Sequence, residues 1–139
     1  MDLKPAAWGT DVMNLEKVIF GFFIVLALTL NFGFFLGDMD NPDHHHIVEL
    51  FLAIVVNLIS TGLKLGDRSQ IGAVLLSTSL VADLQLIAAA IVWTIVVHVT
   101  ETGLVPGVMA SIVSLSGGAL VANLVSVTIL VTDTLMLRR

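Results

Sequence analysis

Apolar residues form four long runs along the chain, and short polar segments separate them. A helix needs about 20 apolar residues to cross the hydrocarbon core of a bilayer, which is about 30 Å thick. The runs are long enough, and they predict helices over about residues 17–36, 46–65, 71–99 and 107–137. Residues 1–16 are polar and mixed, and we expect them to form a short arm in the cytoplasm or at the membrane interface. The pattern predicts an all-α integral membrane protein with four transmembrane helices in a single domain, residues 1–139.

The second predicted span carries a stripe of polar and small residues on an otherwise aliphatic helix. All members but one are three or four residues apart, and the remaining one, Ser60, is next to Thr61, so they share one helix face. They are Glu49, Ala53, Asn57, Ser60, Thr61 and Lys64. Such a stripe must face other helices or water, because lipid tails cannot hydrogen-bond to it. It either joins helices together or lines a permeation path or ligand site.

Polar residues also interrupt the other spans. Asp83 lies near the middle of the third span, and an ionisable residue inside a membrane indicates a functional site. It could accept a proton, contact a cation, or form a hydrogen bond to Asn57 or Asn123 within the bundle. The candidate pathway residues are Asn31, Glu49, Asn57, Thr61, Asp83, Gln85 and Asn123.

The second and fourth spans resemble each other. Residues 53–67 align without gaps with residues 119–133, and the polar matches have more weight than the aliphatic ones, which agree easily by chance. The polar matches pair Asn57 with Asn123, Ser60 with Ser126 and Asp67 with Asp133. Both segments run in the same direction through the membrane, so the alignment predicts a parallel two-helix repeat. Chance similarity is the alternative.

Composition and charge fix the class and the orientation. Of the 139 residues 57% are hydrophobic and 12% are charged, which is too apolar for a soluble domain of this size. In a four-span order every basic residue falls on one side; these are Lys4, Lys17, Lys64, Arg68, Arg138 and Arg139. The positive-inside rule therefore predicts a multi-pass inner-membrane protein with both termini in the cytoplasm. The sequence has no cluster of basic residues of the kind that binds nucleic acid, so we do not expect a nucleic-acid partner.

The loop between the first two spans concentrates candidate metal ligands. They are Asp38, Asp40, Asp43, His44, His46 and Glu49. Five of them match the ligand spacing of an EF-hand loop, but Pro42 and Asp43 occupy the positions that need a ligand and a glycine. We therefore regard the EF-hand match as accidental. Either a divalent cation binds with another geometry, or the loop is a solvated acidic surface that attracts cations.

These features favour a small oligomeric cation channel or transport pathway with an acidic outer vestibule. We expect a homo-oligomer, because four short spans leave too little interior to satisfy so many polar groups within one subunit, and self-association would shelter their polar faces. The alternatives are an accessory or assembly subunit of a larger membrane complex, or a periplasmic metal-binding sensor or carrier. We do not expect an enzyme, because no nucleophile–base pair or cofactor motif is present. The expected partners are the lipid bilayer and copies of the chain or another membrane protein. We expect no cofactor other than a monovalent or divalent cation.

Overall fold

A computed structural model describes residues 3–137, and side chains within the stretch 15–136. The helices are α1 (Leu3–Phe35), α2 (Ile47–Lys64), α3 (Gln70–Thr94) and α4 (Pro106–Leu137), with a short 3-10 turn η1 (Pro42–His44) and a π-helical segment η2 (Ile95–Val99) that continues α3. The described residues contain no strand. All four α-helices contain a stretch long and apolar enough to cross a membrane. The prediction of an all-helical protein with four such helices is confirmed.

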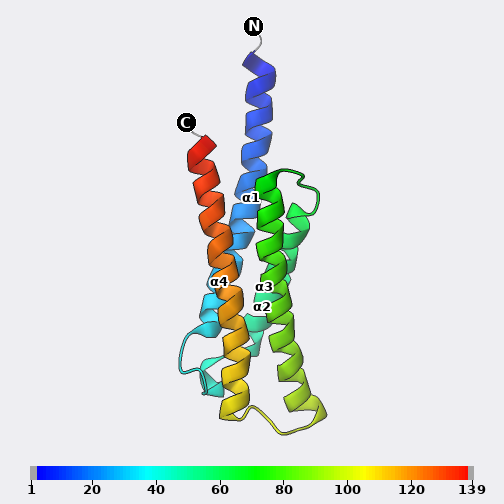
Figure 1. Ribbon diagram of the computed structural model, residues 1–139, viewed down its shortest axis with the longest axis vertical. Coiled ribbons are helices and arrows are strands. Elements are labelled where there is room, and N and C mark those ends of the chain that lie inside the picture. Colours follow the sequence, from blue (N-terminus) through cyan, green and yellow to red (C-terminus); the bar gives the residue numbers. More distant parts are fainter. Residues whose placement is uncertain (1–2, 138–139) are drawn as a thin grey trace.

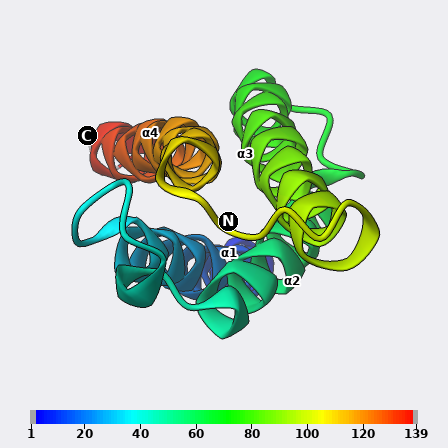
Figure 2. The ribbon, with the colours of Figure 1, turned by 90° about the horizontal axis from the view of Figure 1, so that it is seen from below.

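The four helices form an up-and-down bundle (Figure 1). Seen along its axis, α1 packs mainly on α2 and α4, and α3 packs mainly on α2 and α4, so the order around the axis follows the chain (Figure 2). Both termini and the α2–α3 turn lie at one end, which we name the basic end because Lys64 and Arg68 lie there. Loops 36–46 and 100–105 lie at the opposite end, named the acidic end. Arg138 and Arg139 lie outside the described residues, as does the side chain of Lys4.

Local sequence signals explain where the helices begin. Ser69 is the N-cap of α3, and its hydroxyl accepts a hydrogen bond from the Gly72 N–H over 2.9 Å. Pro106 is the first residue of α4, a position where its missing N–H costs nothing. The change of geometry at the end of the third span has no comparable sequence signal. Residues Ile95–Val99 form a π-helix although neither Pro nor Gly lies among them. The third span is therefore a helix of two geometries.

The apolar interior is divided into two clusters at different heights. Toward the acidic end, buried side chains from all four helices pack together; among them are Phe34, Leu50, Leu86, Met109, Ile112 and Val113. Toward the basic end a smaller cluster contains Phe20, Ile24 and Leu75. Large apolar side chains such as Phe51, Leu84 and Val121 are 60–71% exposed on the outside, as expected for helices that face lipid.

Polar side chains fill the interior between these clusters. Asn31, Asn57 and Asn123 are each 0% exposed, and Asp83 is 6% exposed, within one chain. The bundle covers them because α1 and α3 each lie between α2 and α4, so every helix turns one face toward the axis. Each of these four residues nevertheless keeps at least one polar atom without a hydrogen-bond partner among the described residues, so one chain buries the groups but does not satisfy them all. That agrees with the expectation that four spans have too little interior to satisfy them within one subunit, and self-association stays a prediction.

Gly37 is a position where the loop depends on glycine. Its φ is +101°, and an added Cβ would lie 2.6 Å from His44 Cβ. We expect Gly37→Ala to lower the free energy of unfolding by about 2 kcal/mol, because alanine is strained at positive φ and collides with His44. Thermal unfolding of the purified protein in detergent measures this. Gly66→Ala is the matched control, since no atom lies within 4 Å of its added Cβ; equal melting temperatures for the two variants would contradict the prediction.

Candidate functional site: a buried polar layer

A layer of buried polar side chains crosses the middle of the bundle. All four helices contribute to it, and each member is at most 7% exposed. The members are Asn31 of α1; Asn57, Ser60 and Thr61 of α2; Ser79 and Asp83 of α3; and Ser116, Asn123 and Ser126 of α4. The stripe predicted on the second span therefore faces the interior, with Lys64 and Glu49 half-buried near its two ends.

Asp83 is the only ionisable member of this layer, and its partner is a threonine. The Thr61 hydroxyl donates to Asp83 Oδ2 over 2.5 Å, which joins α2 to α3. A hydrogen bond between Asp83 and Asn57 or Asn123 had been one expectation, but the structure places neither amide on this carboxyl group. Asp83 Oδ1 is buried and has no hydrogen-bond partner among the described residues.

Several other buried oxygen atoms also lack hydrogen-bond partners within residues 15–136. With Asp83 Oδ1 they are Asn57 Oδ1, Ser79 Oγ, Gln85 Oε1 and Asn123 Oδ1. The Asn31 and Asn123 side-chain nitrogens are likewise unpaired there. Buried polar groups are nearly always paired, because each unpaired one costs about 1–3 kcal/mol. Carboxylate, amide and hydroxyl oxygens are also the groups that hold hard cations in proteins.

Side-chain contacts between helices fix the heights of the other members. The Ser116 hydroxyl donates to Asn31 Oδ1 over 3.1 Å, and the hydroxyls of Thr78 and Ser126 contact each other. Gln85 reaches α4 at Gly118, where its amide occupies the space that a Cβ would need. The layer therefore links α1 to α4, α2 to α3 and α3 to α4.

In α1, α3 and α4 the polar residues lie between large side chains of the two apolar clusters, whereas α2 contributes only to the larger cluster. In α3 the order is Leu75, then Ser79 and Asp83, then Leu86. In α4 it is Ile112 and Val113, then Ser116, Asn123 and Ser126, then Leu130, which packs on the smaller cluster. Ala119 and Ala122 of the larger cluster lie among these polar residues. Apolar packing thus covers the layer toward the acidic end on all four helices and toward the basic end on α1, α3 and α4.

The aligned segments of α2 and α4 are buried in the same way. Across residues 53–60 and 119–126 each aligned pair has the same degree of burial: the first, fourth, fifth and eighth positions are buried, and the third, sixth and seventh are exposed. Asn57 and Asn123 therefore occupy equivalent positions on diagonally opposite helices. Their match includes the environment as well as the residue type.

The candidate metal ligands of the acidic-end loop do not gather around one point, as they would in an EF-hand loop. Asp38, Asp40, Asp43, His44 and His46 are exposed, and Glu49 lies against Gly33 of α1. The His44 ring accepts from the Asp38 N–H through Nδ1 over 2.8 Å. In the described part of the chain no three His, Asp or Glu side chains lie close enough together to hold a metal ion. Metal binding here stays a prediction.

His45 was not among the residues that the sequence indicated as functional, but it is buried and contacts two carbonyl oxygens. It is 1% exposed, with Nδ1 lying 2.5 Å from the Phe34 carbonyl oxygen and Nε2 lying 2.7 Å from the Asp38 carbonyl oxygen. Carbonyl oxygens only accept hydrogen bonds, so a ring nitrogen that carries a proton donates to the carbonyl oxygen that it faces. His45 therefore joins the end of α1 to the loop and anchors the start of α2.

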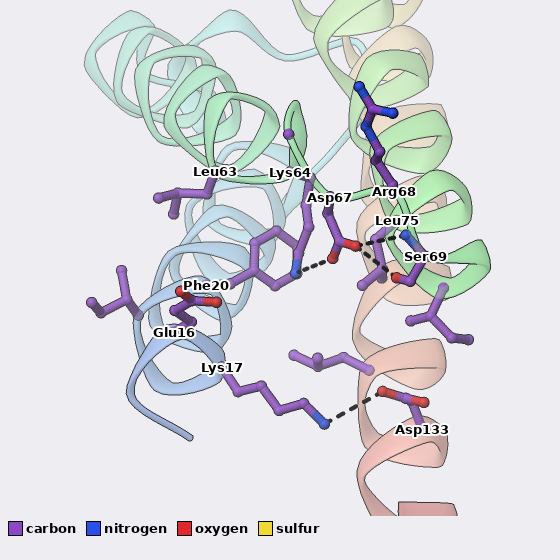
Figure 3. A pocket seen from close by; sticks show the side chains of 14 residues that line it. Glu16, Lys17, Phe20, Leu63, Lys64, Asp67, Arg68, Ser69, Leu75 and Asp133 are labelled. Carbon is purple, nitrogen blue, oxygen red and sulfur yellow. Dashed lines mark hydrogen bonds and ion pairs between the residues drawn. The ribbon is translucent and has the colours of Figure 1, made fainter. Parts of the chain in front are cut away.

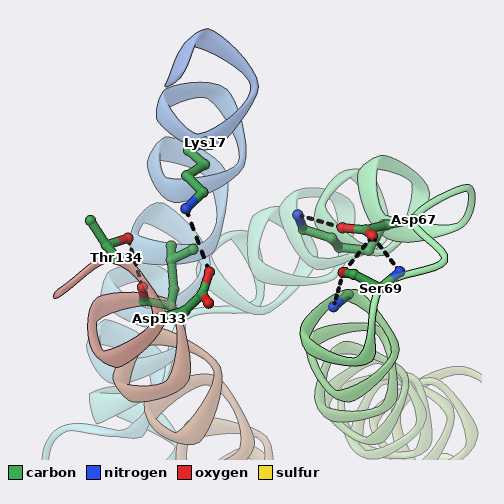
Figure 4. A network of polar contacts seen from close by, with 8 residues as sticks. Lys17, Asp67, Ser69, Asp133 and Thr134 are labelled. Carbon is green, nitrogen blue, oxygen red and sulfur yellow. Dashed lines mark hydrogen bonds and ion pairs between the residues drawn. The ribbon is translucent and has the colours of Figure 1, made fainter. Parts of the chain in front are cut away.

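A cavity of about 780 Å³ opens at the basic end, and the lining includes Glu16, Lys17, Lys64, Asp67, Arg68 and Asp133 (Figure 3). Two ion pairs lie on its walls: Lys17 with Asp133, and Lys64 with Asp67, each 3.5 Å apart (Figures 3 and 4). The hydroxyl and N–H of Ser69 both donate to Asp67, and these hydrogen bonds lower the pKa of Asp67 below its usual value. In the sequence these basic residues indicate only the orientation of the chain in the membrane.

Comparisons with known proteins give one match. A family described as a family of unknown function (DUF6394) matches residues 44–134. That stretch contains the α2, α3 and α4 members of the polar layer, and Asn31 lies before it. No curated protein and no solved structure matches the chain.

Proposed function

The chain belongs to a family of unknown function, DUF6394, and we propose that it binds a small cation in the polar layer and carries it across a membrane. The membrane is the cell inner membrane, with the basic end and both termini in the cytoplasm. In the four-span order every Lys and Arg falls on that side, and the positive-inside rule assigns this side to the cytoplasm. The acidic end then faces outward.

The observation on which the proposal rests is the set of unpaired buried oxygens. Asn57 Oδ1, Asp83 Oδ1 and Asn123 Oδ1 come from three helices and have no hydrogen-bond partner in the described chain. A cation gives each of these oxygens a positive partner in an interior that otherwise penalises them. Asp83 is the single carboxyl group of the layer, so charge balance favours a monovalent cation, either a proton or a small metal ion.

The route follows the polar stripe of α2. Cations collect at the acidic end, where Asp38, Asp40 and Asp43 form an exposed negative surface. Glu49, Asn57 and Thr61 then lead inward to Asp83, with Asn123 on the opposite helix. Because apolar side chains of α1, α3 and α4 lie on both sides of the layer, transport requires these side chains to move apart on one side at a time. This favours a gated pathway over an open pore.

The parallel repeat gives this site a simple origin. A pseudo-twofold axis along the bundle would relate α1 and α2 to α3 and α4 and would place Asn57 and Asn123 on opposite sides of the cation. The equal burial of residues 53–60 and 119–126 supports this relation. The axis of the repeat and the route of the cation would then coincide.

The proposal includes self-association of the chain. It assigns no enzymatic activity to the protein. The accessory-subunit and metal-sensor alternatives predict no flux through the purified protein. Flux into proteoliposomes therefore separates transport from both of them.

The experiment compares cation uptake by proteoliposomes that contain wild type, Asn57→Leu or Leu58→Ile. Asn57→Leu keeps a similar volume but removes a buried oxygen of the site, so we expect uptake to fall at least about tenfold, the value of one lost interaction of about 1.4 kcal/mol. Leu58, the residue after Asn57, has a side chain that is 47% exposed on the outside of the bundle. Leu58→Ile should therefore leave uptake within about twofold of the wild-type value. Wild-type uptake no greater than that of empty liposomes would reject the proposed function.

A further inference from the structure

The cavity at the basic end lies at the height where the membrane meets water. Lys64 is the last residue of the span Ile47–Lys64, and Lys17 and Asp133 lie within three residues of the ends of their spans, Leu15–Phe35 and Pro106–Met136. Asp67, Arg68 and Ser69 form the turn beyond α2. A molecule in this cavity would have one part at the level of lipid headgroups and another beside the hydrocarbon core.

Charges of both signs line the cavity in equal number. Lys17, Lys64 and Arg68 supply three positive charges, and Glu16, Asp67 and Asp133 supply three negative ones. The two ion pairs belong to opposite walls, one between α1 and α4 and the other between α2 and the following turn (Figure 3). A ligand between these walls meets an ammonium group and a carboxylate on each side.

The ion pairs leave capacity for a ligand. Each has a nitrogen–oxygen distance of 3.5 Å, longer than a charge-assisted hydrogen bond of about 2.7–2.9 Å. Lys64 Nζ also lies 4.4 Å from the centre of the Phe20 ring, at the base of the cavity. These lysine N–H groups can turn to a phosphate without first breaking a tight bond.

The geometry points to a binding site for the phosphoethanolamine headgroup of a membrane phospholipid, held between the Lys17–Asp133 and Lys64–Asp67 pairs. The phosphate accepts hydrogen bonds from the lysines, and the ammonium group donates to the carboxylates. Each charge of the headgroup therefore meets the opposite charge on both walls. This inference is independent of the cation site, which lies beyond Phe20 and Leu75 in the bundle interior.

Other headgroups fit these walls less well. Phosphatidylglycerol offers a phosphate but no cation, so it would leave Asp67 and Asp133 facing a negative ligand. Asp67 is ionised at neutral pH, as an aspartate normally is, and its hydrogen bonds from Ser69 lower its pKa further. Phosphatidylcholine has a cation without N–H groups and cannot donate to either carboxylate. Apolar side chains complete the fit: Ile19 and Leu63 line the cavity and are also exposed on the outside of the bundle, beside the acyl chains.

The test measures lipid adducts of the full-length protein in detergent by native mass spectrometry. Phosphatidylethanolamine, phosphatidylcholine and phosphatidylglycerol with identical acyl chains are titrated separately. We expect the ethanolamine lipid to bind about tenfold more tightly than either other lipid, the ratio that one charge-assisted hydrogen bond gives. Asp133→Asn should reduce this preference to about threefold or less, because it removes an acceptor for the ammonium group. Lys17→Gln and Lys64→Gln remove donors to the phosphate that all three lipids share, so each should weaken the binding of every lipid at least about threefold. Asp40→Asn, at the acidic end, should leave the preference unchanged.

Loss of folding does not confuse the test, because these ion pairs are partly exposed and stabilise the fold little. Circular dichroism checks that each variant keeps its helices. Equal binding of the three lipids overturns the inference, as does a preference for phosphatidylglycerol, which would indicate a simple anion site. A preference that survives Asp133→Asn, or an affinity that neither lysine substitution lowers, places the lipid elsewhere and overturns the inference. Soluble O-phosphoethanolamine that binds as tightly as the lipid would show that the ligand is not a membrane component.

Discussion

Replacing Asp83 with asparagine should reduce cation uptake into proteoliposomes at least about a hundredfold, the largest effect that we expect on activity. The substitution keeps the shape of the side chain and an oxygen that can accept from Thr61. It removes the only negative charge of the polar layer. A cation in a buried site without a counter-charge costs several kcal/mol, and about 2.7 kcal/mol corresponds to a hundredfold change in occupancy.

The control for Asp83→Asn is Glu101→Gln, which removes one carboxylate from an exposed loop residue. Uptake by that variant should stay within about twofold of wild type, because the charge is solvated and screened by salt. Both variants should elute from a sizing column with the wild-type volume. Uptake by Asp83→Asn equal to that of wild type would show that the cation does not pass this carboxylate, even if the protein transports.

The largest expected effect on stability is at His45. We expect His45→Phe to lower the free energy of unfolding by about 3 kcal/mol, and the melting temperature on the order of 10 °C. Phenylalanine fills the same space and keeps the contact with the Phe34 ring, whose centre lies 5.5 Å from that of His45. It leaves the carbonyl oxygens of Phe34 and Asp38 without the ring nitrogens that face them. The loss thus measures hydrogen bonding and not volume.

The adjacent histidine gives a matched control. His46 is the N-cap residue of α2, but its exposed side chain makes no capping hydrogen bond. His46→Phe should therefore change the free energy of unfolding by less than about 0.5 kcal/mol. Thermal unfolding in detergent, followed by circular dichroism, compares the two variants. Equal melting temperatures would mean that the His45 hydrogen bonds do not stabilise the folded protein.

The helices and the inward direction of the polar stripe could be predicted because both depend on local periodicity. Apolar runs of about 20 residues have one stable solution in lipid, and a polar stripe on such a helix must turn away from lipid. The four-helix pattern and the inward stripe of α2 agree with the structure. Burial of Asn57 and Asn123 at equivalent positions also follows from their equivalent spacing on two parallel segments.

Long-range pairings could not be predicted, because they depend on how the helices slide against one another. Thr61, and not Asn57 or Asn123, contacts Asp83 in the structure, and the spacing within each helix does not determine which of these residues meet. Three consecutive histidines look alike in sequence, and only the path of the loop after Gly37 turns His45 inward. The cavity at the basic end arises in the same way, where basic residues from separate elements meet.

The lengths of the helices differ enough to deform the bilayer around them. Helix α2 has 18 residues and a length of roughly 27 Å, whereas α3 and η2 together have 30 residues and a length of roughly 45 Å. Beside α2 a hydrocarbon core of about 30 Å must become thinner, and this hydrophobic mismatch costs a fraction of a kcal/mol per Å. Two copies that meet along α2 would release the compressed lipid between them. Self-association would then grow stronger as the bilayer thickens, and its driving force would be membrane elasticity and not the pairing of polar side chains.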